Sequence, residues 1–219
     1  MAPATSSWGH AFVKQYLLMC LLGSWSYTAS AQAPADGQPT RKLPVSFGLR
    51  LGLNYSNTNF NMGEPKPVVP VETTWKPGFL VGALVEVELT KRWAIQQEYL
   101  YAQQSGEVRN GGARYQMQYL SLPLLLKYRV LPRLALVAGP QFDLLLSARQ
   151  DLGGQRTDIT HDTEERGFSA AAGLEARIWR SLSLSARYLQ GLNHVGIGQR
   201  SAVQEFKWQS VQVAAEVRF

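Results

Sequence analysis

The sequence has 219 residues, a charged fraction of only 17%, an aromatic fraction of 11% and a formal net charge of +6. The balance is basic, but the chain has no Lys/Arg run and no nucleic-acid motif, so we predict no nucleic-acid partner. A mildly basic surface without a specific partner is the first interpretation, and anionic lipid head groups or a surface glycolipid are the next.

The N-terminus has the three regions of a secretory signal peptide. Residues 1–14 carry one lysine and no acidic group, residues 16–25 are apolar, and small residues stand at Ala29 and Ala31. We expect cleavage after Ala31, so that residues 1–31 direct export. A transmembrane anchor is the alternative, but the apolar run is shorter than the roughly 20 residues that a spanning helix needs. The single cysteine lies in this segment, so the mature protein is expected to fold without disulfides.

The remainder of the chain alternates apolar and polar residues with a period of two, which is typical of β-strands. We expect a short linker over residues 32–44 and a single β-domain over residues 45–219. Eight strands are predicted, over residues 45–55, 78–89, 93–103, 118–128, 134–147, 168–178, 182–191 and 207–219.

The connections between these strands alternate in length, which places all long loops at one end. This pattern predicts an all-β fold, an eight-stranded antiparallel up-and-down transmembrane β-barrel with short periplasmic turns and longer extracellular loops. Strands of about ten residues match the thickness of a bilayer. The predicted long loops are 56–77, 104–117, 148–167 and 192–206, and the predicted short turns are 90–92, 129–133 and 179–181.

Aromatic residues are expected to form a belt at each membrane interface, as in other transmembrane barrels. The alternative is that aromatics simply favour strands. The belt on the short-turn side comprises Trp93, Tyr128, Trp179 and Phe219, and the belt on the long-loop side comprises Tyr55, Phe79, Tyr101 and Tyr188.

Charged residues within the predicted strands lie opposite the apolar stripes. A lipid-facing Arg or Lys at mid-bilayer costs about 2–4 kcal/mol, so these groups must face the lumen, where acids and bases pair. An eight-stranded barrel is just wide enough for its side chains to fill it, so we predict a plugged lumen and a structural rather than catalytic role for the acids. The residues are Arg50, Glu86, Glu88, Glu98, Lys127, Glu175, Arg177, Arg187, Glu216 and Arg218.

The most apolar segment, residues 119–140, has a helical hairpin as its alternative interpretation. Pro123, Pro132 and Pro140 argue against helices, because each removes a backbone donor. Pro123 and Pro140 are also awkward in central strands, and we expect them at bulges or local register breaks.

Four segments resemble the PorT-like outer-membrane β-barrel proteins of Bacteroidetes. They are WKPGFLVGALVEVELTKRWAIQQEYLYAQQSG at 75–106, YLSLPLLLKY at 119–128, LALVAGPQFDLLLSA at 134–148 and ARYLQGLNHV at 186–195. The specificity comes from their order and spacing, which cover the chain from about residue 45 to 219. Gln97 and Ser121 depart from the family pattern, where a proline and an acid are common.

The resemblance also implies a role for the final segment, SVQVAAEVRF. Outer-membrane barrels commonly end in such an alternating strand closed by an aromatic, which implies that Phe219 is a lipid-facing anchor and that the barrel assembly machinery reads this strand during insertion. A closing strand must also pair with the first one, because an open edge is not tolerated in lipid. For one branch of the family, the resemblance implies a place in a secretion apparatus.

Three features contain residue types that occur in chemical sites, and none is predicted to be one. His161 lies among Asp158, Asp162, Glu164 and Glu165 and could bind a divalent cation, but a solvated acidic loop is the simpler interpretation. His194 lies in another predicted loop, and no His-x-Ser stretch typical of lipid hydrolases occurs. Gly111 and Gly112 indicate a hairpin turn rather than a phosphate loop. We therefore predict no catalytic, cofactor or metal-binding residues and no cofactor.

The sequence thus predicts a non-enzymatic integral protein of the outer membrane, exported through a cleaved signal peptide, with a structural, attachment or surface-binding role. Its expected partners are outer-membrane lipid and the assembly machinery, and no surface partner is named. A component of a secretion apparatus is the alternative. A soluble exported barrel that binds an apolar ligand is a further alternative, although such a barrel needs the opposite arrangement of charged and apolar faces.

Overall fold

The computed structural model describes residues 43–62, 68, 70–109, 113–197 and 204–219. The predicted signal peptide, most of the predicted linker and the Gly111–Gly112 turn lie outside this part and remain predictions. The long strands are β1 (Val45–Asn59), β2 (Thr73–Glu88), β3 (Trp93–Val108), β4 (Ala113–Leu131), β5 (Leu134–Leu152), β7 (Arg166–Arg177), β8 (Leu182–Gly191) and β10 (Gln204–Arg218). Shorter elements are the strands β6 (Gln155–Asp158) and β9 (Val195–Ile197) and the 3-10 turns η2 (Phe60–Met62) and η3 (Thr160–Asp162).

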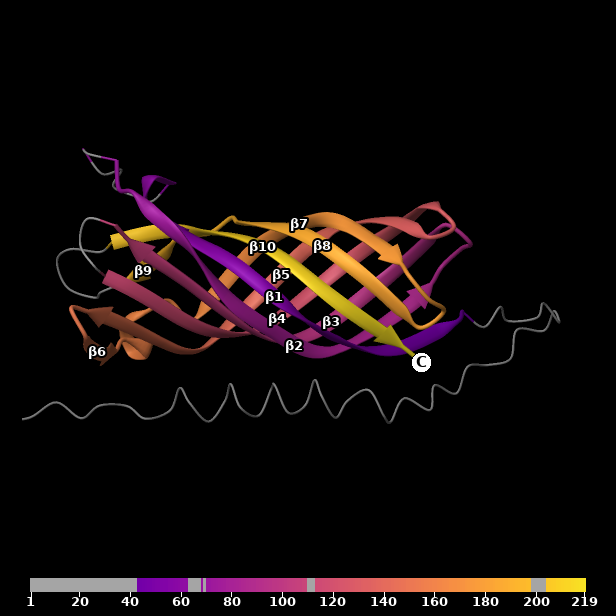
Figure 1. Cartoon of the computed structure of the whole chain (residues 1–219), viewed down its shortest axis with the longest axis horizontal. Helices are drawn as coiled ribbons and strands as arrows, with labels where there is room; N and C mark the ends of the chain where they lie inside the picture. Colours follow the sequence, from indigo (N-terminus) through magenta and orange to yellow (C-terminus); the bar gives the residue numbers. More distant parts are fainter. Residues whose placement is uncertain (1–42, 63–67, 69, 110–112, 198–203) are drawn as a thin grey trace, which may run out of the picture. The chain divides into compact units, whose positions relative to one another are not determined.

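The long strands close into a barrel. Each pairs antiparallel with the next long strand along the chain, and β10 returns to pair with β1 from Gly48↔Arg218 to Asn59↔Lys207 (Figure 1). The backbone N–H of Phe219 donates to the carbonyl of Phe47 at 3.0 Å and extends this seam. The predicted eight-stranded antiparallel up-and-down barrel is confirmed. Within the described residues, no helix is long and apolar enough to cross a membrane.

The short connections lie together at one end of the barrel, as predicted. Only residues 89–92, 132–133 and 178–181 separate the strands there, at the right-hand end of Figure 1. The strands at the opposite end are longer than predicted. Segments assigned to the loops 104–117 and 148–167 belong largely to β3, β4, β5 and β6, and the other two predicted loops also begin or end as strand.

The extra strand length has a physical cause that is clearest on β4. Over its membrane part, outward residues such as Leu124 and Leu126 are apolar and 46% exposed. Nearer the long loops the alternation reverses, because Tyr115 and Met117 point inward and are buried while Arg114 points outward and is exposed. A barrel that leaves the bilayer must turn its polar face to water, so the period of two continues with the opposite phase.

The expectation of bulges at the two prolines was wrong. The β3–β4 register is the same on both sides of Pro123, with Gln97↔Leu124 before it and Leu100↔Ser121 after it. Pro140 stays paired with Ala170 of β7. Proline removes one ladder hydrogen bond to a single neighbour, which the sheet tolerates without a shift. The β4–β5 irregularities lie elsewhere, between Gln118 and Tyr119 and near the turn between Arg129 and Leu131.

The small barrel also depends on close strand contacts at Gly82, an inward position of β2. A Cβ placed on this glycine would lie 2.0 Å from the carbonyl oxygen of Tyr99 on β3. Glycine at such positions allows the strands to coil tightly enough to close.

Candidate functional site in the barrel lumen

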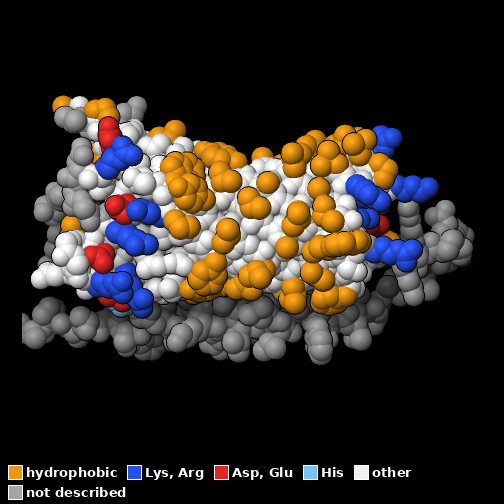
Figure 2. All heavy atoms as spheres, in the orientation of Figure 1, with side chains coloured by type: hydrophobic (Ala, Val, Ile, Leu, Met, Phe, Trp, Pro, Cys, Tyr) orange, Lys and Arg blue, Asp and Glu red, His pale blue; other side chains and the backbone are white. Residues whose placement is uncertain are grey.

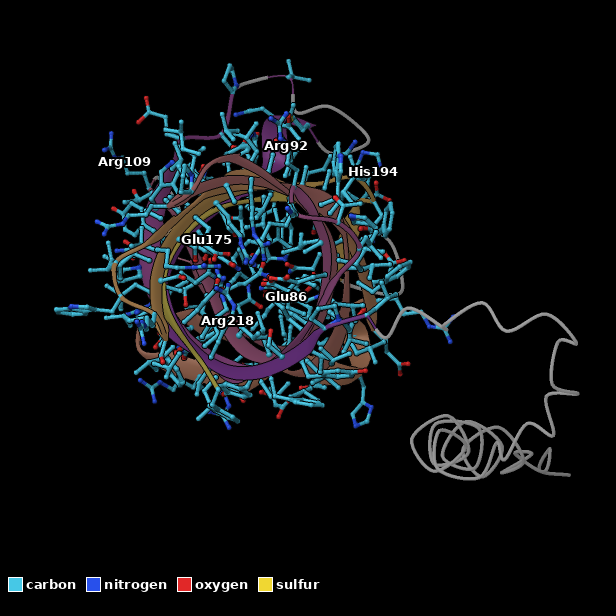
Figure 3. All side chains as sticks on the ribbon, turned by 90° about the vertical axis from the view of Figure 1, so that its right-hand side faces the viewer. Glu86, Arg92, Arg109, Glu175, His194 and Arg218 are labelled. Carbon is cyan, nitrogen blue, oxygen red and sulfur yellow. The ribbon has the colours of Figure 1, made fainter. Side chains whose placement is uncertain are left out.

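The half of the lumen nearest the short turns contains an ionic layer of four cations and four carboxylates. Seven of the eight long strands contribute to it, and β5 alone does not. All members are buried except Arg218, which is partly buried. Figure 3 shows Glu86, Glu175 and Arg218 pointing toward the centre of the barrel. The members of the ionic layer are Arg50, Lys127, Arg187, Arg218, Glu86, Glu98, Glu175 and Glu216.

The ionic layer has two groups of charges joined by one arginine. In the first, Arg187 Nη2 lies 2.8 Å from Glu98 Oε1 and 3.1 Å from Glu216 Oε1, and Arg50 bonds to the same Glu216 oxygen. In the second, Lys127 Nζ lies 2.7 Å from a Glu86 oxygen and 2.5 Å from a Glu175 oxygen.

Arg218 connects the two groups. Its Nη2 lies 2.6 Å from Glu175 and 2.7 Å from Glu216, and its Nε lies 3.2 Å from Glu86. Every carboxylate of the layer thus has at least two cationic neighbours, and the layer is electrically neutral as a whole. Such pairing is what permits charged groups to stay buried.

Two of the ten predicted lumen charges lie on the inward face but at its rim, outside the ionic layer. Arg177 is exposed, because it is the last residue of β7 and lies at the rim. Glu88 is only partly buried, with a side chain that is 36% exposed, and it pairs with Arg129. Sequence reasoning placed Arg129 in a turn, whereas it belongs to β4 and also lies 3.1 Å from Glu86.

A polar layer follows toward the middle of the lumen. Asp143 is buried and accepts hydrogen bonds from Ser121, from Gln141 at 2.8 Å and from Ser169 at 3.3 Å. No salt bridge to Asp143 is formed by any described residue. The sequence analysis overlooked this carboxylate, although its place in an apolar run within LALVAGPQFDLLLS was a signal that it faces inward.

An apolar layer fills the lumen at the long-loop end. Phe206 lies at its centre, with ring centroids 5.2 Å from Phe60, 6.4 Å from Tyr115 and 5.1 Å from Trp208. The indole N–H of Trp208 donates to the Tyr119 hydroxyl at 3.2 Å. Segments outside the long strands also contribute, from η2, from β9 and from the chain just before η3. The buried members of this apolar layer are Phe60, Tyr115, Met117, Tyr119, Ala148, Ile159, Val195, Phe206 and Trp208.

We expect Phe206→Leu to lower the free energy of unfolding by about 1–1.5 kcal/mol, because leucine keeps most of the buried volume but loses the ring contacts. Phe47→Leu is the matched control, since Phe47 is 55% exposed on the outer face and its replacement should change stability by less than about 0.5 kcal/mol. Urea titrations in detergent micelles measure both. Equal effects for the two variants would contradict the assignment of Phe206 to a packed layer.

The outer surface is apolar in a broad band between charged ends, as Figure 2 shows. Leu49, Leu51 and Leu53 of β1 are 58%, 63% and 66% exposed. Exposed aromatics border the band as predicted: Trp93, Trp179 and Phe219 toward the short turns, and Tyr55, Phe79 and Tyr188 toward the long loops. An apolar exterior around a charged interior is opposite to what a soluble ligand-binding barrel requires, and that alternative is rejected.

The two predicted loop histidines lie outside the lumen. His194 contacts the carbonyl oxygen of Met62 through Nε2 at 3.1 Å, and its Nδ1 is 3.9 Å from Glu205. His161 lies in η3. Hydrogen bonds from the Thr160 hydroxyl and backbone N–H lower the pKa of Asp158. Among the described residues, no group of three or more His, Cys, Asp or Glu is arranged to hold a metal ion.

Comparison with known proteins agrees with this architecture. The family model of the outer membrane protein beta-barrel domain matches residues 31–196. A comparison with curated proteins finds no match. Among solved structures, Neisserial surface protein A (NspA) aligns with a TM-score of 0.50 and 12% identity over 80% of this chain and 99% of its own. Ail, the attachment invasion locus protein of Yersinia pestis, aligns with a TM-score of 0.47 and 14% identity over 80% and 98%.

Proposed function

On the premise that the chain belongs to the outer membrane protein beta-barrel domain family and lies in the outer membrane, we propose that it is a non-enzymatic barrel with a lumen closed to diffusion. Its role is structural or surface-binding, carried by the long-loop end. The proposed partners are outer-membrane lipid and, during insertion, the barrel assembly machinery.

The neutral ionic layer is the observation that carries this proposal. Its eight side chains come from seven strands and converge on the axis, where they are almost entirely shielded from solvent. The apolar layer at the other end supports the same conclusion, since a packed aromatic cluster leaves no continuous aqueous path. The absence of enzymatic activity is supported by the ion pairs that occupy each carboxylate of the ionic layer.

We expect the purified protein to produce no stepwise conductance in a planar lipid bilayer, because two layers of packed side chains block the axis. Insertion is verified by the heat-dependent gel shift of the same sample, and an open porin serves as the positive control. Reproducible conductance steps from a fully folded sample would contradict the closed lumen.

The resemblance to PorT-like proteins supports a second candidate, a component of a secretion apparatus. The motifs in residues 75–106 and 119–128 carry it. The two functions differ in the phenotype of a deletion strain. Loss of several secreted proteins from the medium, restored by the intact gene, would favour the secretion role, whereas an unchanged set of secreted proteins would favour the structural or surface role.

A further inference from the structure

A small pocket lies on the outer wall of the barrel at the long-loop end, where β4, β5 and β6 run side by side. Its volume is about 150 Å³, and its lining includes Arg114, Arg149 and Arg156 together with Gln116 and Asp151. Arg114 is registered with Asp151, Asp151 with Arg156, and Gln116 with Arg149. Cross-strand partners share a face, so the three guanidiniums project from adjacent strands on one side of the sheet.

Two of these arginines form no salt bridge to any described residue, although each has an acidic residue beside it in register, Glu107 beside Arg114 and Asp158 beside Arg149. Arg156 has only Asp151 at 3.5 Å. Asp151 also accepts a hydrogen bond from the Gly154 N–H at 3.0 Å. Asp158 keeps its charge while it accepts the Thr160 N–H at 2.9 Å, and Glu107 is paired with Lys76 at 2.5 Å. Three arginines against Asp151 and Asp158 leave the pocket with one net positive charge.

The pairing of the cations beside the pocket, at the same end of the barrel, is different. There, Lys76 pairs with Glu107 at 2.5 Å and Arg109 pairs with Glu72 at 3.3 Å. Lys76 and Arg109 are therefore in salt bridges, whereas Arg114 and Arg149 in the pocket form none with a described residue. Unpaired arginines gathered at a concave site are suited to an external anion.

The pocket lies just beyond the apolar band. On β4, Leu120 is the last outward apolar residue, and the Gln116↔Arg149 row is four residues further along. At about 3.3 Å per residue and a tilt of about 40°, this row is about 10 Å above the edge of the hydrocarbon. At that height an outer-leaflet lipid presents its head group rather than its acyl chains.

We propose that Arg114, Arg149 and Arg156 form a phosphate-binding site for the phosphorylated head group of an outer-leaflet glycolipid. A guanidinium fork binds two phosphate oxygens at once, and three forks around one pocket surround the group from several sides. The proposal rests on the proposed function in one respect, namely that the long-loop end faces the cell exterior. A free phosphate ester offers the same chemistry, and the test separates the two sources.

The test compares the intact protein with an Arg114→Gln/Arg149→Gln variant, both folded in detergent micelles. The probes are lipid A carrying its phosphates, the same lipid A after phosphatase treatment, and inorganic phosphate, with binding measured by native mass spectrometry. We expect phosphorylated lipid A to bind the intact protein best and to bind the variant at least about tenfold more weakly. Lys76→Gln/Arg109→Gln removes the same charge from the paired side of the rim and should bind like the intact protein.

Equal binding of the two forms of lipid A, or unchanged binding by the arginine variant, would overturn the proposal. Preference for inorganic phosphate over phosphorylated lipid A would assign the pocket to a soluble ester and overturn the glycolipid source. The heat-dependent gel shift shows that each variant is folded. Binding of lipid A in micelles does not depend on whether the lumen is closed. The conductance experiment tests the closed lumen separately, so the two proposals can fail independently.

Discussion

Replacing Arg187 with leucine is expected to lower the free energy of unfolding by about 3–5 kcal/mol, because it leaves buried carboxylates without their guanidinium. Arg187 is only 3% exposed and lies 2.8 Å from Glu98 and 3.1 Å from Glu216. After the replacement, Glu98 retains only Arg50 as a cation, at 3.7 Å. The layer would then carry four carboxylates and three cations.

The double variant Glu98→Leu/Arg187→Leu separates charge balance from shape. It removes one group of each sign, so the ionic layer stays neutral. Arg50 keeps its bond to Glu216, and Lys127 still donates a hydrogen bond to Gln96 at 2.6 Å. We expect the double variant to recover most of the lost stability, because replacing a whole buried pair with apolar groups is often neutral. Urea titration in micelles, followed by the gel shift, measures all forms.

Arg149→Leu, on the exposed outer wall, is the matched control and should change stability by less than about 0.5 kcal/mol. A double variant as unstable as Arg187→Leu alone would show that packing shape, rather than charge balance, governs the lumen. An Arg187→Leu variant as stable as the control would show that the ionic layer does not hold the barrel together.

The membrane-spanning part of the fold could be predicted from the sequence because there the two faces differ most. Outward leucines such as Leu51 and inward charges such as Arg50 alternate without interruption on β1. A slip of one residue would exchange the two faces, so the pattern fixes both strand and register. The seven strands that meet in the ionic layer could be identified for the same reason.

The upper parts of the strands could not be predicted because the alternation changes phase as the barrel leaves the lipid. On β10, Phe206 and Trp208 point inward, whereas Val211 and Val213 point outward. A search for one continuous apolar stripe ends the strand at such a change and assigns a loop. The apolar layer was missed with it, since its members come from segments far apart in the chain that only the closed barrel brings together.

The outward apolar band leads to the second large expected effect. Leu51 lies near the middle of the outward face of β1 and is 63% exposed, with Ala215 and Val81 as its partners in register. We expect Leu51→Arg to lower the free energy of unfolding of the protein in vesicles by about 2–4 kcal/mol, because a guanidinium at the centre of the bilayer loses its hydration.

Val45→Arg is the control on the same strand and face. Val45 is 52% exposed and is the first residue of β1, so an arginine there reaches the lipid head groups and should cost no more than about 1 kcal/mol. Urea titrations of the protein folded into phosphatidylcholine vesicles give both values. Since the two residues are similarly exposed to solvent in the isolated barrel, a difference between the variants has to come from their depth in the bilayer. Equal costs would place the bilayer elsewhere on the barrel and contradict the assignment of this band to lipid.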